Sequence, residues 1–309
     1  MKTWRLPLGG RTAKGKAIVN ILPIPTGVSV AAIMPVDRDE AEWGDLQIVF
    51  ATTQGDVRRN RLSDFTNVRS NGKIAMKLPE GVELVNARIC SEDDDVMLTT
   101  NSGRAIRFAS TDLRVMNSRA STGVRGIRLT GDDMVVSMSV IRHFEATPEE
   151  RATYLKMRRA MAGVTDDEAV EDDVPADPNF SQERYEEMRA VENLILTITR
   201  GGSGKLSSSH DYPVRGRGGM GVAAMDKAMR GGPVVASFPV EFVDQIMLVT
   251  STGQSIRCPI DGISFRSRNA GGVRVFNTSS DEKVVSVAYI PDQGDDEDMP
   301  EESTSEIES

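Results

Sequence analysis

The sequence has few of the residues that usually carry chemistry. Its 309 residues include two cysteines, two histidines and only 5% aromatic residues. Two cysteines cannot form a disulfide framework, and Cys90 and Cys258 lie in apolar stretches, so we expect buried thiols in a reducing compartment. His143 and His210 belong to no cluster with metal-ligand spacing and to no nucleophile motif. We therefore predict no catalytic residue and no metal site.

Long apolar runs are absent as well. No stretch is long enough to span a membrane, and no signal-peptide pattern is present, so we expect a cytoplasmic protein without a membrane partner.

Two glycine motifs resemble nucleotide sites but fail their requirements. Gly216-x-Gly218-x-x-Gly221 opens no crossover helix, and Gly204-Lys205 is followed by Leu206 where a phosphate loop needs Ser or Thr. No cofactor is predicted for this chain.

The acidic excess is confined to two segments. The chain carries 37 Lys and Arg against 46 Asp and Glu, a net charge of -9. Residues 292–309 hold nine acidic and no basic residues, and residues 142–192 hold fourteen acidic and seven basic ones. The remaining body therefore has 30 basic and 23 acidic residues, a net charge of +7. A basic body with separate acidic segments indicates a polyanionic partner.

Glycine is abundant, at 27 residues, and much of it recurs in a unit with a period of about fifty residues. Each full copy has an apolar strand, a first glycine, a second strand, a second glycine and two more strand-like runs. The first glycines are Gly55, Gly103, Gly202 and Gly253, and the second are Gly72, Gly123, Gly221 and Gly272. The N-terminus carries only a second half, around Arg11 and Gly15. This pattern predicts an all-β, propeller-like array of four-stranded antiparallel blades.

Residues 142–192 interrupt the repeat. Thr147-Pro-Glu-Glu is a helix-start pattern that predicts a helix to Gly163, and Ser181 is placed to cap a second helix towards Ala190. We therefore expect blades over residues 1–141, the first of them partial, and over residues 193–291. An acidic helical insertion at 142–192 separates them, and an acidic tail at 292–309 is expected to be disordered.

An arginine stands three or four residues before each second glycine, with further basic residues nearby. If each repeat is one blade, these side chains recur at one height around the rim, where they would contact phosphates of duplex DNA without reading its sequence. The predicted DNA-binding residues are Arg11, Lys14, Lys16, Arg58, Arg59, Arg69, Lys73, Arg107, Arg119, Arg125, Arg128, Arg215, Arg217, Arg257, Arg266, Arg268 and Arg274. Alternatively, the repeated arginine braces neighbouring blades by binding a carbonyl or carboxylate group.

Four stretches resemble the C-terminal domain of the DNA gyrase A protein. They are Gly15-Lys-Ala-Ile-Val-Asn-Ile-Leu-Pro, Phe50-Ala-Thr-Thr-Gln-Gly-Asp-Val-Arg, Thr122-Gly-Val-Arg-Gly-Ile-Arg-Leu and Asp244-Gln-Ile-Met-Leu-Val-Thr. The resemblance implies a six-bladed β-pinwheel whose basic perimeter wraps DNA, so that the ATP-driven holoenzyme can introduce negative supercoils. It implies as partners duplex DNA, the remainder of gyrase A and the gyrase B protein in an A2B2 holoenzyme. ATP and Mg would be needed on other domains.

Two departures from the family pattern leave alternatives open. The gyrase-A box of the family's first blade is missing, so we expect an N-terminally truncated fragment that begins within the second blade. Arg217-Gly-Gly-Met-Gly resembles the box only as a degenerate relative. The domain with the cleavage tyrosine and the ATPase are also absent, so the chain alone is expected to be non-catalytic. The alternatives are the corresponding C-terminal domain of topoisomerase IV and a β-propeller that scaffolds protein partners.

Overall fold

The computed structural model describes most of the repeat body and both helices. The described residues are 6–8, 16–22, 24–25, 27–36, 40–66, 72–163, 174–226, 231–277 and 282–292. Three of the predicted DNA-binding residues, Arg11, Lys14 and Arg69, lie outside these ranges. The acidic tail beyond residue 292 also lies outside them, so its predicted disorder stays a prediction.

Short antiparallel strands make up the described chain, with two α-helices between β7 and β8. The strands are β1 Gln47–Thr52, β2 Asp56–Arg61, β3 Leu84–Cys90, β4 Asp94–Thr100, β5 Arg104–Ala109, β6 Val124–Arg125, β7 Val135–Arg142, β8 Leu194–Thr199, β9 Ser203–Ser208, β10 Val222–Ala223, β11 Val234–Val240, β12 Gln245–Thr250, β13 Ser255–Pro259, β14 Val273–Arg274 and β15 Val284–Ile290. The helices are α1 Pro148–Met161 and α2 Gln182–Ala190, and the 3-10 helices are η2 Ile18–Asn20, η3 Glu40–Gly44, η4 Leu62–Phe65, η5 Ser110–Asp112 and η7 Ser209–Asp211.

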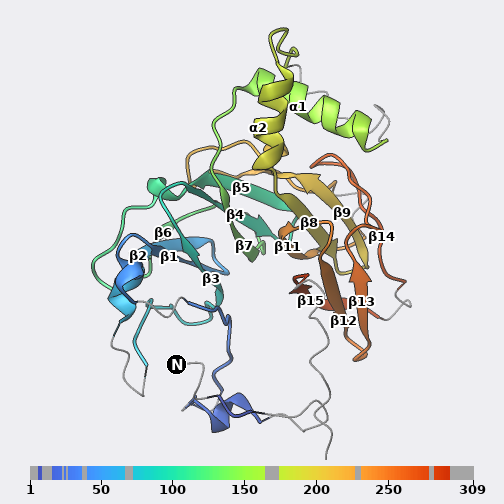
Figure 1. Cartoon of the computed structure of the whole chain (residues 1–309). Coiled ribbons are helices and arrows are strands. Elements are labelled where there is room, and N and C mark those ends of the chain that lie inside the picture. Colours follow the sequence, from blue (N-terminus) through green and yellow to red (C-terminus); the bar gives the residue numbers. More distant parts are fainter. Residues whose placement is uncertain are drawn as a thin grey trace, which may run out of the picture.

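The strands form four sheets that follow one another in an arc (Figure 1). Their strand orders are β3-β1-β2-β6 in the first sheet, β10-β5-β4-β7 in the second, β11-β8-β9-β14 in the third and β13-β12-β15 in the fourth. Strands β3, β7, β11 and β15 lie at the inner end of the arc and line a shared cavity of about 570 Å³. The predicted all-β array of antiparallel blades is confirmed, with four strands in the first three sheets and three described strands in the fourth.

One feature of the repeat prediction was wrong: a repeat is not a blade. The short strand after each second glycine pairs with the preceding repeat, so that β6 pairs with β2, β10 with β5 and β14 with β9. Each of the first three sheets therefore takes its outermost strand from the repeat that follows it. Sequence periodicity cannot distinguish the two arrangements, because both have the same period.

The second glycines Gly123 and Gly221 make this strand exchange possible. A Cβ on Gly123 would lie 2.5 Å from the Val57 carbonyl oxygen, and one on Gly221 would lie 2.3 Å from the Ala105 carbonyl oxygen. Both glycines also have positive φ, 105° and 68°, a region that other residues rarely adopt. Glycine is therefore required where the outer strand meets the backbone of the strand beneath it.

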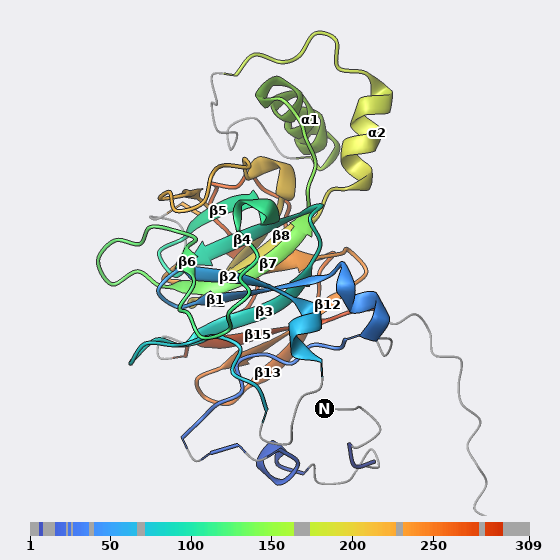
Figure 2. The ribbon, with the colours of Figure 1, turned by 90° about the vertical axis from the view of Figure 1, so that its left-hand side faces the viewer.

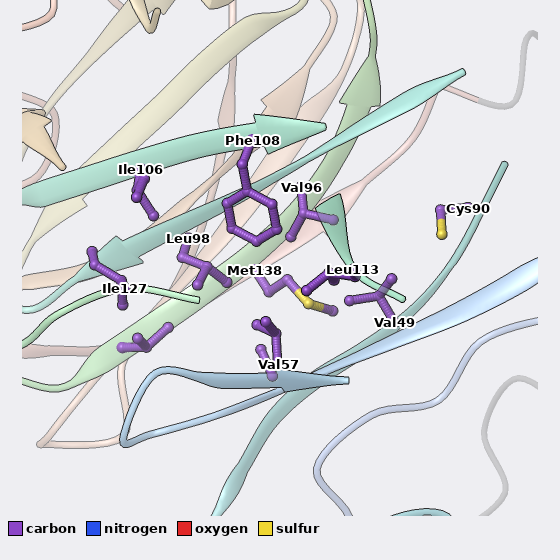
Figure 3. Packing of buried hydrophobic residues seen from close by; sticks show 12 residues of the cluster. Val49, Val57, Cys90, Val96, Leu98, Ile106, Phe108, Leu113, Ile127 and Met138 are labelled. Carbon is purple, nitrogen blue, oxygen red and sulfur yellow. The ribbon is translucent and has the colours of Figure 1, made fainter. Parts of the chain in front are cut away.

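Neighbouring sheets pack face to face through apolar side chains. Between the first and second sheets, Val49, Val57, Leu98, Phe108 and Met138 belong to one cluster whose members are at most 3% exposed (Figure 3). A similar cluster joins the third and fourth sheets. The first strands β1 and β8 are buried along their whole length, which is usual for continuous apolar runs covered on both faces. In β12 of the last sheet, buried and half-buried residues alternate.

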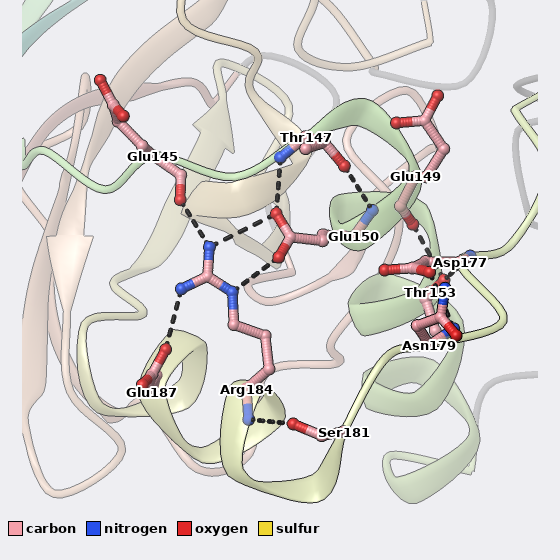
Figure 4. Close-up of polar contacts among 10 residues, drawn as sticks. All are labelled: Glu145, Thr147, Glu149, Glu150, Thr153, Asp177, Asn179, Ser181, Arg184 and Glu187. Carbon is pink, nitrogen blue, oxygen red and sulfur yellow. Dashed lines mark hydrogen bonds and ion pairs between the residues drawn. The ribbon is translucent and has the colours of Figure 1, made fainter.

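Both predicted helices of the insertion are confirmed. They stand together above the rim of the second and third sheets (Figures 1 and 2). At the start of α1, Thr147 Oγ1 accepts a hydrogen bond from the Glu150 amide, and the Glu150 carboxylate accepts one from the Thr147 amide, which completes a capping box. Arg184 of α2 binds that carboxylate at 2.7 Å and also the Glu187 carboxylate at 2.8 Å (Figure 4). Among the described residues, no helix is long and apolar enough to cross a bilayer.

The two helices contact the third sheet through their side chains and not only through the connecting backbone. The Arg158 guanidinium lies 4.6 Å from the ring centre of Phe265 and is paired with Glu192 at 3.0 Å. His210 of η7 packs edge-on against Tyr154, with ring centres 5.0 Å apart, and its Nε2 lies 2.8 Å from the Met188 carbonyl oxygen. The insertion therefore shares its small apolar core with the rim of the propeller.

Acid should loosen this attachment. Burial lowers the pKa of His210, although the Met188 carbonyl opposes the shift. An unfolded histidine titrates near pH 6.5, so as pH falls below about 6.5 the unfolded state binds a proton that the folded site refuses, and stability is lost. We expect amide-exchange protection in α1 and α2, corrected for intrinsic rates, to fall between about pH 7 and pH 5. His210→Phe should abolish that pH dependence, and a dependence that survives in this variant would contradict the assignment.

Candidate nucleic-acid interface

Four of the predicted DNA-binding arginines are buried in the fold. Arg58 is 0%, Arg59 and Arg107 are 4% and Arg268 is 9% exposed. Arg58 lies within the first sheet, where its Nη1 donates to the Ser121 carbonyl at 2.6 Å and its Nε to Asn60 Oδ1 at 2.6 Å. Burial, assisted by Arg119, lowers the pKa of Arg58. These four side chains cannot reach a ligand while the sheets are intact, so we remove them from the proposed interface.

Arg107 holds three parts of the fold together. Its Nε pairs with Asp95 Oδ2 at 2.7 Å, Nη1 donates to the Ser209 carbonyl at 2.8 Å and Nη2 donates to the Arg142 carbonyl at 3.2 Å. The other oxygen of Asp95 lies 2.8 Å from Nδ1 of His143. Burial lowers the pKa of Arg107, against the opposing influence of the Asp95 charge. The carboxylate therefore supplies the counter-charge that makes a buried guanidinium tolerable.

The arginine that precedes the second glycine is a brace in two described repeats. Arg217 donates through Nε to the Asp112 carbonyl and through Nη1 to the Arg125 carbonyl, both at 3.1 Å. Arg268 repeats both contacts one sheet later, with the Asp211 carbonyl at 2.9 Å and the Ala223 carbonyl. Asp112 and Asp211 end equivalent 3-10 helices, and Arg125 and Ala223 end equivalent outer strands. The bracing alternative therefore describes both residues, but Arg217 remains exposed whereas Arg268 does not.

In each of the first three sheets, a cation from the second strand supports the loop before the outer strand. We call these loops, residues 116–123, 215–221 and 266–272, the outer loops. Arg58 supports the first, and Arg104 supports the second by donating to the Met220 and Gly221 carbonyls, both at 2.7 Å. Lys205 supports the third through the Ser267, Arg268 and Ala270 carbonyls.

Sequence reasoning missed the structural roles of Arg104 and Lys205. Lys205 is 0% exposed, and burial lowers its pKa to about 7. The repeat contains the signal that could have found it, because Lys205 follows the first glycine Gly202 by three residues, as Arg58 follows Gly55. Lys205 is therefore the counterpart of a buried brace.

Four other predicted residues are exposed and close together on the perimeter. Arg125 ends β6, Arg128 follows it, and Arg215 and Arg217 lie in outer loop 215–221. The two segments are joined by the contact of Arg217 with the Arg125 carbonyl, by the Arg128 amide with the Gly219 carbonyl at 2.8 Å, and by the Gly218 amide with the Gly126 carbonyl at 2.6 Å. We call these four residues the perimeter cluster. It brings four guanidinium groups from two repeats onto one exposed surface.

The remaining predicted residues are spread around the arc. Lys16, Arg257 and Arg274 are exposed, and Arg119 and Arg266 are half-buried. Lys73 is half-buried too, and its Nζ donates to the Asp64 carbonyl at 3.2 Å and to that of Thr66. The structure thus divides the described part of the predicted set into four buried arginines, one compact exposed cluster and six further cations spread around the arc.

The matches to known proteins fall on the repeats and leave out the helical insertion. The family described as DNA gyrase C-terminal domain, beta-propeller, matches residues 1–37, 47–91, 94–142, 193–238 and 244–291. These five segments correspond to the five repeats, and the segment with α1 and α2 is left unmatched. The folds of two solved structures are also similar. They are titled "Crystal structure of the C-terminal domain of DNA topoisomerase IV" (TM-score 0.67, 18% identity, covering 90% of this chain and 71% of that one) and "Structure of DNA gyrase A C-terminal domain" (TM-score 0.57, 21% identity, covering 80% and 66%).

Among curated proteins, the DNA gyrase A protein of Granulibacter bethesdensis is 46% identical over 317 residues, which cover 96% of this chain and 34% of that protein. The DNA gyrase A protein of Rickettsia bellii is 39% identical over 309 residues, covering 99% of this chain and 34% of the relative. The chain thus spans about a third of the length of these relatives, which carry the gyrase name rather than that of topoisomerase IV. With its repeats matched in order, the chain belongs to the family of DNA gyrase C-terminal domains with a β-propeller fold.

Proposed function

We propose that this chain binds duplex DNA without sequence specificity and wraps it around the perimeter of the arc, as part of a DNA gyrase A protein. The observation that carries the proposal is the perimeter cluster of Arg125, Arg128, Arg215 and Arg217, exposed on a body whose net charge is +7. Guanidinium groups on such a surface neutralise phosphates whatever the base sequence. A curved rim that holds phosphates at successive sheets favours bent DNA.

The wider setting belongs to the same proposal. The relatives are about three times as long as this chain, so we place it in a cytoplasmic holoenzyme with the remainder of gyrase A and with gyrase B. Wrapping would support negative supercoiling there, and the ATP and Mg that this reaction requires would bind to other domains. This chain's own part is to bind and orient DNA, and none of its described residues is assigned a catalytic step.

Salt titration tests the proposal. We expect the chain to bind fluorescent duplexes of unrelated sequence with equal affinity. The logarithm of the binding constant should fall linearly with the logarithm of salt concentration, by about 0.9 for each phosphate contacted. A matched single strand serves as the comparison. Failure to bind duplex DNA, or binding that does not change between low and moderate salt, would rule the proposal out and favour a protein-binding propeller.

A further inference from the structure

Outer loop 215–221 differs from its two sister loops in a specific way. When the three loops are aligned on their second glycines, the position five residues earlier is Ser118, Gly216 or Ser267. The position two residues earlier is Ser121, Gly219 or Ala270. The sister loops therefore carry a Cβ at both positions, and only the loop on the second sheet has glycine at both.

The fold does not need these two glycines. A Cβ on Gly216 would meet nothing within 4 Å, and one on Gly219 would meet only Ile106 Cδ1, at 3.7 Å, an ordinary contact. Neither residue has a positive φ. Gly218 and Gly221 of the same loop contrast with them, since their φ values are 82° and 68° and a Cβ on Gly221 would collide with the backbone. Because an unneeded glycine costs conformational entropy on folding, Gly216 and Gly219 need another explanation.

What these two glycines provide is uncovered backbone. Both are exposed. The amides of Arg215 and Gly218 donate to the carbonyls of Arg107 and Gly126 at 2.9 and 2.6 Å, whereas within the described chain the amides of Gly216 and Gly219 have no acceptor. A ligand can approach a glycine backbone more closely than any other. Turn amides that have no acceptor within the protein are suited to bind an anion.

The charges around the loop indicate that its ligand is an anion. All four arginines of the perimeter cluster are exposed and belong to the loop or to the segment bonded to it, with Arg215 and Arg217 in the loop and Arg125 and Arg128 in that segment. In the hydrogen bonds and strand pairings of the described residues, the cluster meets two acidic residues, Asp56 and Asp112. Asp56 is opposite Arg125 in the β2–β6 ladder, and the backbone carbonyl of Asp112 is held by Arg217. The loop therefore combines free amide donors with a local excess of positive charge.

We propose that outer loop 215–221 holds a backbone phosphate of duplex DNA directly against the amides of Gly216 and Gly219, with the guanidinium groups of Arg215 and Arg217 beside it. This inference rests on the DNA binding proposed above and specifies its tightest contact. The sister loops are then expected to contribute mainly charge, because they carry a side chain at both corresponding positions. The loop on the second sheet is then the point that fixes where the DNA meets the perimeter.

The test uses substitutions that the sister loops already contain. In the full chain, Gly216→Ser and Gly219→Ala are combined, and Gly262→Ser serves as the matched control. Gly262 is exposed, has no positive φ and has open space at its Cβ position, but it lies in another loop. We expect the double variant to bind a fluorescent duplex about tenfold more weakly, the effect of losing charge-assisted hydrogen bonds. Its melting temperature should equal or slightly exceed that of the parent.

A second measurement needs no variant. Adding duplex DNA to the parent chain should slow hydrogen exchange at the amides of Gly216 and Gly219 more than at the amides of Ser118 and Ser121. If the parent binds DNA but the double variant binds within about twofold of it, or if DNA leaves the two glycine amides unprotected, the inference fails and the proposed function stands. If the parent does not bind duplex DNA at all, the proposed function fails first.

Discussion

Replacing Asp95 with alanine should lower the free energy of unfolding by about 3–5 kcal/mol, the usual loss when one partner of a buried ion pair is removed. Asp95 is 0% exposed and Arg107 only 4%. The substitution would leave a guanidinium in the interior without a counter-charge. Three segments depend on that group, namely the start of β4, the end of β7 and η7. Since the free energy of unfolding of a domain is about 5–15 kcal/mol, this loss is a large part of the total stability.

Urea denaturation followed by circular dichroism would measure this loss. Glu187→Ala is the matched control, because it removes a carboxylate from an ion pair with Arg184 whose two side chains are 29% (Arg184) and 52% (Glu187) exposed. Such pairs contribute about 0–1 kcal/mol. Combining Asp95→Leu with Arg107→Met should restore part of the stability by removing both charges. A loss below about 1 kcal/mol for Asp95→Ala would show that the guanidinium finds another partner.

Replacing all four arginines of the perimeter cluster with alanine should nearly abolish DNA retention at moderate salt. Each lost phosphate contact removes about 0.9 from the slope of log affinity against log salt, so the slope should shrink by about 3 to 4. Affinity should fall by about 100-fold or more. The expected effect is large because Arg125, Arg128, Arg215 and Arg217 lie on one surface, where a single DNA segment can contact all of them.

The control for this experiment is the same set changed to lysine. Lysine keeps the charge but cannot reproduce the forked contacts of Arg217 with the Asp112 and Arg125 carbonyls. The lysine variant should therefore retain most of the salt slope even if it melts slightly earlier. Thermal melts of both variants separate loss of binding from loss of fold. An alanine variant that is folded and keeps the parent's slope would remove the perimeter cluster from the DNA path.

The sequence predicts the local units of this fold well. Gly123 and Gly221 mark their turns because positive φ and close backbone contact admit only glycine. Thr147 and Ser181 mark helix starts because their side chains accept amide hydrogen bonds there. The positive φ of the glycines and the caps of the helices act within a few residues along the chain, so they are recognisable without the rest of the structure.

The roles of the arginines could not be predicted in the same way. Arg58 is bonded to Ser121, 63 positions away, and Arg107 to Ser209, 102 positions away. A periodic arginine has the same appearance in the sequence whether its guanidinium ends in solvent or on a carbonyl of the next repeat. Whether such an arginine is exposed or bound to the next repeat depends on which repeat donates the outer strand. The period of the repeat does not show this.

Because of the donated outer strand, the sheets of this array are not independent units. When the chain is synthesised, β1, β2 and β3 can pair as soon as they emerge, but their sheet waits for β6, which follows β4 and β5. Each of the first three sheets is thus finished by residues that belong to its successor, and a cut between two such repeats leaves the earlier sheet incomplete. Loss of the segment that carries an outer strand therefore affects the preceding sheet as well as its own repeat, whereas the segment between β7 and β8 that holds α1 and α2 interrupts no strand of either sheet.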